Sequence, residues 1–302
     1  MPTSPNPVVA NQTSPILREM AGAVLNAPVA GNTTIVRLPA GRTYHDVIIE
    51  TLLAAQAVPT RAQLTLGVLN LRLVVSGSEV WSVTGQQLLG IQCYYSEIDT
   101  SADGRLLLSF ERLSYLAGFD INAILGPSFG TLDQSSFDIE IDWNASSLIV
   151  SAKAYARIGQ SPENAGKIIR LARVTANMSA LGVYQYPDLP APKKGDFMYC
   201  IHIFPAVIAN ITRIAYIPDE QRMIDLPLGV MNKLAQECHP PRTPQTATNQ
   251  FSLDFCIRGM PGDAIDLSKV GGHLLELTAI NAAPGLIPIV CEIASDLAGV
   301  TG

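Results

Sequence analysis

The sequence predicts an all-β protein of two tandem sandwiches, and three observations lead to that fold class. Apolar and polar residues alternate with a period of two along many short segments, as they do in half-buried strands. Turns that contain glycine or proline separate these segments, and helical periodicity is confined to short stretches. The chain of 302 residues also resembles itself at an offset of about half its length.

Residues 64–73 and 137–143 show the alternation most clearly. The second segment places apolar side chains on odd positions and carboxylates on even ones. Turns such as Pro39-Ala40-Gly41 mark the ends of neighbouring strands. The other predicted strands are 33–38, 44–53, 105–112, 147–157, 168–175, 197–204, 211–217, 251–258, 273–280 and 286–293.

The sequence also predicts short helices, at 14–26, 84–93 and 227–238. The first of them has one apolar face and belongs to an N-terminal arm. That face is expected to dock on the protein's own sandwich or on a neighbouring subunit rather than on lipid, because Arg18 is its only cation. The expected contact residues of the arm are Ile16, Leu17, Met20, Val24 and Leu25.

Corresponding segments recur in the two halves of the chain. Residues 139–149 and 275–287 each read as a strand, an Asn-Ala turn and a return strand. A strand followed by a short helix also occurs in both halves. Duplication of one all-β unit accounts for this pattern, and each unit would hold about eight strands, as a jelly roll does. The expected double jelly roll consists of an arm at 1–30, a first jelly roll at 31–158 and a second jelly roll at 159–302.

Hydrophobic residues make up 48% of the chain and charged residues only 15%, whereas an ordinary soluble domain carries about 25% charged residues. No apolar window reaches the ~18 residues of a membrane span, and the N-terminus lacks the pattern of a secretion signal. The apolar content is therefore expected to lie in large contacts with other proteins. A net charge of −6 without any basic run disfavours specific nucleic-acid binding.

The five cysteines are scattered, odd in number and never spaced as C-x-x-C. They indicate reduced, mostly buried thiols of a protein made in a cytosol, with neither a disulfide framework nor a zinc site. The four histidines lie far apart in the sequence, which disfavours the metal centre of a two-domain cupin enzyme. No cofactor and no catalytic residue are predicted.

Two segments imitate known functional loops. Residues 126–130 have the spacing of a nucleophile elbow, but a strand rather than a helix follows them, so a plain loop is expected. Residues 99–104 imitate the first half of a calcium loop, but Phe110 stands where that loop needs a bidentate Glu. An ordinary Asp-Gly turn is expected there.

Three carboxylates, Asp138, Glu140 and Asp142, share one face of the strand predicted at 137–143 and are spaced about 7 Å apart along it. Such a ladder holds calcium where another loop supplies further oxygens. The alternative is the solvated face of a half-buried strand. Structural calcium is therefore the metal hypothesis that the sequence raises.

Residues 35–49 join a strand, a Pro-x-Gly turn and a Thr-Tyr pair that leads into the next strand. This segment resembles the start of the first jelly roll in major capsid proteins of icosahedral bacteriophages with an internal membrane. The corticovirus-type double jelly-roll capsid proteins are similar here, in size and in the strand that closes the first domain. The Flavobacterium lipid-phage capsid protein is another candidate relative. The turn residues that carry the resemblance are Pro39, Gly41, Thr43 and Tyr44.

The resemblance implies a structural major capsid protein that is not an enzyme, and no catalytic or binding residue carries over. It also implies homotrimers that form pseudo-hexameric tiles of an icosahedral shell. The implied partners are further copies of the chain, penton or spike proteins, and an internal lipid membrane. The arm would face this membrane or the neighbouring trimers. The protein would be made in the host cytoplasm and located in the virion.

Two other classes of protein stay open. A tandem β-sandwich that binds or cleaves glycans, such as a peptide N-glycosidase-like fold, would need a signal peptide and a carboxylate pair in an aromatic-lined cleft. Only Trp81 and Trp143 are available to stack on sugars. A phage spike or receptor-binding protein is also β-rich and trimeric, but its usual fibrous repeats are not visible. The mass in solution distinguishes a trimeric capsid protein from a monomer that cleaves glycans.

Overall fold

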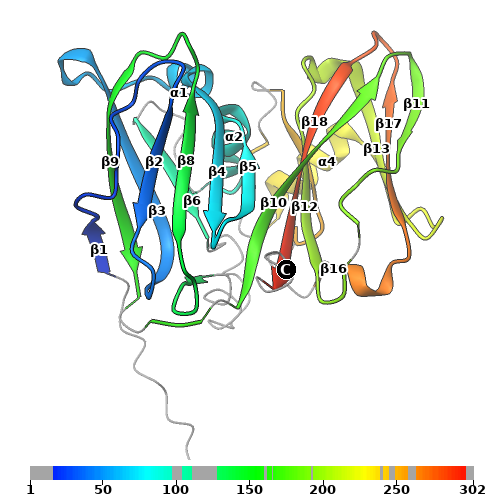
Figure 1. Cartoon of the computed structure of the whole chain (residues 1–302). Coiled ribbons are helices and arrows are strands. Elements are labelled where there is room, and N and C mark those ends of the chain that lie inside the picture. The colour runs from blue at the N-terminus through cyan, green and yellow to red at the C-terminus, as the bar shows by residue number, and fades with distance from the viewer. Residues whose placement is uncertain are drawn as a thin grey trace, which may run out of the picture.

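The computed structural model describes residues 16–96, 104–110, 128–159, 162–164, 166–191, 193–238, 241–244, 249–257 and 263–296. These residues form two β-sandwich lobes that stand side by side (Figure 1). Lobe 1 runs from β1 to β9 in chain order, and lobe 2 runs from β10 to β18. In the described part of the chain, no helix is long and apolar enough to cross a membrane.

The strands of lobe 1 are β1 (Ile16–Glu19), β2 (Thr33–Leu38), β3 (Thr43–Leu53), β4 (Val68–Val75), β5 (Ser78–Val83), β6 (Arg105–Ser109), β7 (Phe129–Gly130), β8 (Phe137–Trp143) and β9 (Ile149–Ile158). The strands of lobe 2 are β10 (Lys167–Met178), β11 (Gly182–Tyr186), β12 (Phe197–Ile203), β13 (Ile211–Pro218), β14 (Ile224–Pro227), β15 (Phe251–Asp254), β16 (Ile265–Asp266), β17 (His273–Ala279) and β18 (Gly285–Asp296). The helices are α1 (Arg61–Gly67), α2 (Gly85–Tyr94) and α4 (Leu228–Glu237), with 3-10 turns η1 (Ala54–Gln56), η3 (Ile208–Asn210) and η6 (Leu267–Lys269). The predicted all-β fold class is confirmed.

Each lobe encloses its core between two sheets. In lobe 1 the order β1-β9-β3-β6, with β7 also on β3, forms one sheet, and β2-β8-β4-β5 forms the other. In lobe 2 the corresponding orders are β10-β18-β12-β15, with β16 on β12, and β11-β17-β13-β14. Side chains alternate between the core and the outer face, and every odd residue from Phe137 to Trp143 is buried.

Strand β10 joins the two lobes. It pairs with β18 along its whole length and also meets the edge strand β5 of lobe 1 in parallel, where Leu171 lies opposite Trp81. The indole Nε1 of Trp81 donates to the carbonyl oxygen of Ile169 at 2.6 Å. One sheet of lobe 1 and one sheet of lobe 2 are thereby continuous.

The strand pairings of lobe 1 recur in lobe 2, element by element. The pairs β1·β9, β3·β9, β3·β6 and β2·β8 correspond to β10·β18, β12·β18, β12·β15 and β11·β17. Bulges coincide as well: the register of β3 on β9 shifts after Tyr44, and that of β12 on β18 shifts after Met198. Helices α2 and α4 follow the equivalent strands β5 and β14. The internal duplication predicted from the sequence is therefore present in the fold.

The strand predicted at 64–73 begins only at Val68, because α1 takes up the preceding residues. A capping box starts this helix. The Thr60 hydroxyl accepts the backbone N–H of Gln63, and the Gln63 side chain accepts the N–H of Thr60. Alternation alone does not separate a short buried helix from a strand. The helices predicted at 84–93 and 227–238 are present as α2 and α4.

The helix predicted at 14–26 is wrong from Ile16 onward. Residues Ile16–Glu19 form β1, which pairs antiparallel with the edge of β9, and Val24 bridges to Val36 of β2. The edge of β9 offers a row of backbone partners that outweighs a short, isolated helix. Residues 1–15 lie outside the described residues, as do 99–103 of the imitation calcium loop and the start of the imitation nucleophile elbow.

His273 of β17 is buried in lobe 2. Its Nδ1 lies 3.0 Å from the Tyr216 hydroxyl, and its Nε2 lies 2.9 Å from the carbonyl oxygen of Pro190. Burial lowers the pKa of this imidazole below its ordinary value. The folded protein therefore binds the His273 proton less tightly than the unfolded chain does.

We expect the free energy of unfolding to fall as the pH drops through the ordinary imidazole pKa of about 6.5. Below that pH, His273 binds a proton in the unfolded chain but stays neutral in the folded protein. Urea denaturation from about pH 8 to about pH 5 measures this slope. His273→Gln should make the slope smaller. An unchanged slope in that variant would show that another group causes it.

Candidate assembly surfaces

Helix α2 packs on α1, β4 and β6 of lobe 1, and its C-terminal end reaches the lobe 2 sheet that contains β18, β12 and β15. Nine of its ten residues are buried. A capping box formed by Thr84 and Gln87 starts the helix. A helix that is buried on all sides needs no polar face, which accounts for its uncharged sequence. The junction of the lobes is thus an interface inside a single chain.

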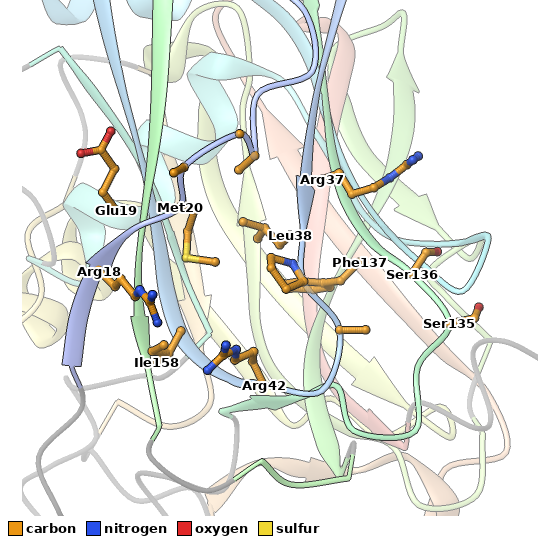
Figure 2. A pocket seen from close by; sticks show the side chains of 15 residues that line it. Arg18, Glu19, Met20, Arg37, Leu38, Arg42, Ser135, Ser136, Phe137 and Ile158 are labelled. Atoms are coloured by element: carbon orange, nitrogen blue, oxygen red, sulfur yellow. The ribbon is translucent and has the colours of Figure 1, made fainter.

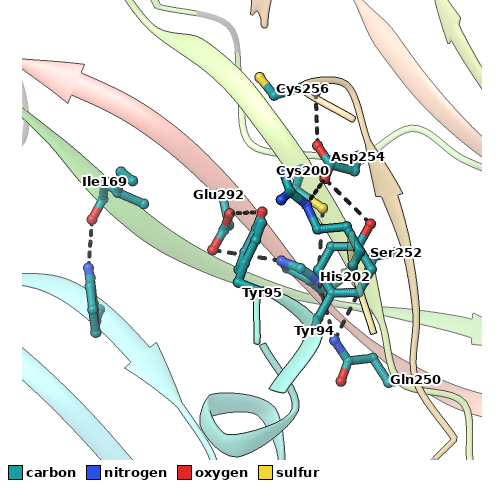
Figure 3. Close-up of polar contacts among 12 residues, drawn as sticks. Tyr94, Tyr95, Ile169, Cys200, His202, Gln250, Ser252, Asp254, Cys256 and Glu292 are labelled. Atoms are coloured by element: carbon teal, nitrogen blue, oxygen red, sulfur yellow. Dashed lines mark hydrogen bonds and ion pairs between the residues drawn. The ribbon is translucent and has the colours of Figure 1, made fainter. Parts of the chain in front are cut away.

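Two tyrosines at the end of α2 reach polar groups of lobe 2 (Figure 3). The Tyr95 hydroxyl donates to Glu292 Oε2 of β18 at 2.6 Å, and the Tyr94 hydroxyl lies 3.4 Å from Asp254 Oδ2 of β15. Both rings also pack edge-on against His202 of β12. Side chains of lobe 1 therefore supply partners for buried carboxylates of lobe 2.

Arg242 and Asp254 form a buried ion pair beside these tyrosines, with 3.0 Å between Nε and Oδ2. The backbone N–H of Cys256 donates to the other oxygen of Asp254 at 2.9 Å. Burial raises the pKa of Asp254, and the charge of Arg242 opposes that rise. Burial also raises the pKa of the Tyr94 hydroxyl, which keeps it a neutral donor.

His202 completes this cluster. Its Nδ1 lies 2.7 Å from Ser252 Oγ, and its Nε2 lies 3.7 Å from Glu292 Oε1. The side chains of His202 and Glu292 are 0% exposed, as are those of Arg242 and Asp254. An acid or base acts only within hydrogen-bond reach of its substrate, and no substrate reaches groups that are closed to solvent. Tyr94 and Tyr95 connect this cluster to lobe 1.

The carboxylate ladder predicted on β8 stands on the outer face of its sheet. Arg37 of β2 donates to Asp138 at 2.9 Å, and Arg72 of β4 contacts Glu140 at 3.0 Å and Asp142 at 3.2 Å. Arginines from both neighbouring strands thus face the three carboxylates. Within the described stretches, no three His, Cys, Asp or Glu side chains come close enough together to hold a metal ion.

The Pro39–Gly41 turn is closed by the tyrosine that follows it. The Tyr44 hydroxyl donates to the carbonyl oxygen of Pro39 at 2.7 Å, and the side chain is buried in lobe 1. Gly41 has a φ of 74°, a left-handed backbone that other residues rarely adopt. The Thr43 hydroxyl accepts the backbone N–H of Glu163 at 3.0 Å. All four turn residues of the resemblance therefore help to fix the start of β3.

The predicted arm residues divide into two groups. Met20 and Val24 are half-buried and pack on the core of lobe 1. Ile16, Leu17 and Leu25 are 51%, 60% and 52% exposed. Exposed apolar side chains on and beside an edge strand are typical of a surface that meets another protein.

A pocket of about 760 Å³ opens between the arm and the Pro39–Gly41 turn (Figure 2). Arg18, Arg37 and Arg42 line it. Among its described lining residues, Glu19 is the one carboxylate, and neither tryptophan is present. A glycan-cleaving site uses two carboxylates across the scissile bond, so this pocket does not provide that chemistry.

Tyr95→Phe removes the hydroxyl that donates to the buried Glu292. We expect the free energy of unfolding to fall by about 1–3 kcal/mol, because the carboxylate loses a partner where water does not replace it. Urea denaturation measures the change. Tyr155→Phe is the matched control, since its hydroxyl makes a longer contact of 3.4 Å with the half-exposed Glu50. A loss below about 0.5 kcal/mol is expected there, and equal losses in the two variants would contradict the role of Tyr95.

The calcium hypothesis for the β8 ladder stays a prediction, and melting curves test it. Calcium would have to displace Arg37 and Arg72 from the carboxylates, so we expect the same Tm in calcium and in chelator. Differential scanning calorimetry measures both values. A calcium-dependent rise in Tm that Asp142→Asn abolishes would establish the site instead.

Two family models match the chain, one for each lobe. The model of the viral coat protein P2 N-terminal domain matches residues 24–159, and that of the viral coat protein P2 C-terminal domain matches residues 168–297. A comparison with curated protein sequences finds no match. The two matched segments together span most of the chain.

Viral capsid proteins of known structure share this fold. The major capsid protein P2 from bacteriophage PM2 has a TM-score of 0.75 at 16% identity, over 93% of this chain and 97% of its own. The major capsid protein of Sulfolobus turreted icosahedral virus has a TM-score of 0.66 at 11% identity, over 93% and 96%. The PBCV-1 virus capsid has a TM-score of 0.60 at 8% identity, over 93% and 92%.

Peptide N-glycanase F, a representative of the glycan-cleaving alternative, has a TM-score of 0.36 at 9% identity. A likeness at that level carries no argument. The two family models, by contrast, cover both lobes, and the duplicated sandwich has the fold of viral capsid proteins. The chain belongs to the viral coat protein P2 family and is a structural capsid protein with a double jelly-roll fold.

Proposed function

We propose that this capsid protein assembles as homotrimers that serve as pseudo-hexameric tiles of an icosahedral virion shell. The observation that carries the proposal is the equivalence of the two lobes, which repeat the same strand pairings and the same bulge. Two similar lobes in each of three chains can fill a nearly hexagonal outline. Rings of this kind need head-to-tail interfaces, in which two different surfaces of the chain meet.

Exposed apolar side chains on both lobes support contacts between copies. Leu17 and Leu25 in lobe 1, and Val183 and Leu286 in lobe 2, are each more than half exposed in the single chain. The low content of charged residues, 15%, also supports contacts between copies, because the centres of protein interfaces are poor in charged side chains.

We propose in addition that the shell encloses an internal lipid membrane and that penton or spike proteins contact the tiles. The sequence resemblance at residues 35–49 supports this part of the proposal. In it, the segment 1–30 faces the membrane or the neighbouring trimers, and the chain is made in the host cytoplasm. A net charge of −6 and the closed polar cluster between the lobes support a protein without nucleic-acid specificity and without enzymatic activity.

The mass in solution tests the trimer. We expect analytical ultracentrifugation to give a species of about three times the chain mass of 32.3 kDa. A protein that stays monomeric at every accessible concentration would contradict the proposal. Incubation with an N-glycosylated protein checks the alternative, because a monomer that releases glycans would be an enzyme rather than a tile.

A further inference from the structure

Two different surfaces of neighbouring lobes meet within one chain. Strand β5 and helix α2 of lobe 1 supply the first, and β10 with the outer face of β18, β12 and β15 in lobe 2 supplies the second. Duplication gives each surface a counterpart on the other lobe. In lobe 2, β14 and α4 correspond to β5 and α2. In lobe 1, β1 and the outer face of β9, β3 and β6 correspond to β10 and the outer face of β18, β12 and β15. Figure 1 shows β1 on the side of lobe 1 that is turned away from lobe 2.

Strand register identifies Leu17 of β1 as the equivalent of Leu171 of β10. Leu17 lies opposite Arg157 on β9, and Leu171 lies opposite Glu292 on β18, in both cases at the first paired position beyond the shared bulge. Leu171 is 2% exposed because it lies against Trp81 of β5, whereas Leu17 is 60% exposed. Leu17 therefore has the place of a buried interface residue without the strand that would cover it.

Ile224 of β14 is the equivalent of Trp81 by its register and by its distance from the helix that follows. Trp81 stands three residues before Thr84, the capping residue of α2, and Ile224 stands three residues before Pro227, the capping residue of α4. β5 is the last strand that lobe 1 contributes to its sheet, next to β10, and β14 is the edge strand of its sheet in lobe 2. The contact between Leu171 and Trp81 thus has a counterpart that the single chain does not make, Leu17 with Ile224, which lie on edge strands of different lobes.

Helix α2, which lies at the junction of the lobes, is more buried than its counterpart α4. Nine of the ten residues of α2 are buried, between α1, β4 and β6 of lobe 1 and the facing sheet of lobe 2, whereas Met231 and Ala235 are the buried residues among the ten of α4. Val230 and Leu234, one turn apart, are 46% and 44% exposed. Helix α4 therefore presents an apolar stripe where α2 has its interface.

The outer face of the lobe 1 sheet offers a matching apolar patch. Ile48 of β3 is paired with Leu107 of β6 and with Tyr155 of β9, and all three side chains are half-buried on this face. The equivalent pair in lobe 2, His202 and Ser252, is buried beneath α2. The patch on lobe 1 is thus at the place where a helix docks on lobe 2.

Charged side chains of the two surfaces also correspond to polar residues of the junction. Within the chain, Arg173 of β10 donates to Asn70 of β4 at 3.4 Å across the junction. The register places Glu19 of β1 at the position of Arg173, and Arg213 of β13 at the position of Asn70. Arg213 is also ion-paired with Asp225 of β14 within the chain, so Glu19 of a neighbouring copy would add a second carboxylate to that pair rather than meet a free cation.

We propose that a second copy of this chain binds at these surfaces. Strand β1 of one copy lies parallel to β14 of the next, with Leu17 opposite Ile224, and α4 of the next copy packs on Ile48, Leu107 and Tyr155. The contact between chains repeats the contact that joins the lobes within a chain, so the ring is continued by strand addition. This inference rests on the proposed trimer and goes beyond it by naming the residues that meet.

A pair of cysteines tests the register, with Leu17→Cys and Ile224→Cys in the same chain. Opposed strand residues have Cα atoms within the range of about 4.4–6.8 Å that a disulfide spans. All variants also carry Cys238→Ser, because the other four native cysteines are buried. After mild oxidation with diamide, we expect chains joined in twos and threes on a non-reducing gel. The control pair, Leu148→Cys with Ile224→Cys, should stay as single chains, since Leu148 is exposed but lies outside the proposed surfaces.

Mass measurement before oxidation separates this inference from the proposed function. Trimers of the Leu17→Cys, Ile224→Cys variant that give no cross-links would overturn the interface and leave the trimer standing. A protein that stays monomeric would overturn both.

Leu17→Asp gives a second readout, which needs no cross-link. It places a carboxylate against Ile224 of the next copy, and we expect the dissociation constant of the trimer to rise at least about tenfold. Leu148→Asp is the matched control and should leave that constant unchanged. Equal effects of the two substitutions would overturn the assignment of β1 to the interface.

Discussion

The contact between β10 and β5 is the interaction on which the rest of the structure depends. β10 belongs to lobe 2 through a ladder of twelve residues with β18, yet its other edge lies against Trp81 of lobe 1. That contact makes one sheet continuous across both lobes, and it brings α2 onto the outer face of β12 and β18. Removal of apolar surface from water contributes there about 25 cal/mol for each Å².

The polar groups beneath α2 have a different role from the apolar ones. A buried ion pair such as that of Arg242 and Asp254 adds little net stability, because desolvation offsets the attraction. Separation of the partners, however, leaves an uncompensated charge in the interior. The bond from Tyr95 to Glu292 has the same property across the two lobes. These groups therefore favour one relative placement of the lobes.

Much of the fold could be predicted from the sequence, because alternation depends on local contact with one core. The segment from Phe137 to Trp143 alternates as predicted, and it forms β8 between two other strands. The edge strands β11 and β14 have few buried positions to show a period and are not predicted, and the prediction also lacks β5, although Val80, Trp81 and Val83 are buried there. The sequence of 14–26 has helical periodicity, but the free edge of β9 draws Ile16–Glu19 into a strand. Periodicity contains no information about such a distant partner.

The candidate surfaces show the same division. Local sequence determined the turn from Pro39 to Tyr44, the facing of the carboxylates on β8, and the apolar character of the arm. Only the tertiary structure decided that Arg37 and Arg72 face those carboxylates, and that Tyr95 meets Glu292, which is 197 positions away. It also decided that α2 is covered while its duplicate α4 is not. The reason is physical: the period of a strand or helix records which side of an element is buried, whereas the partner that buries it is chosen by the packing of segments far apart in the chain.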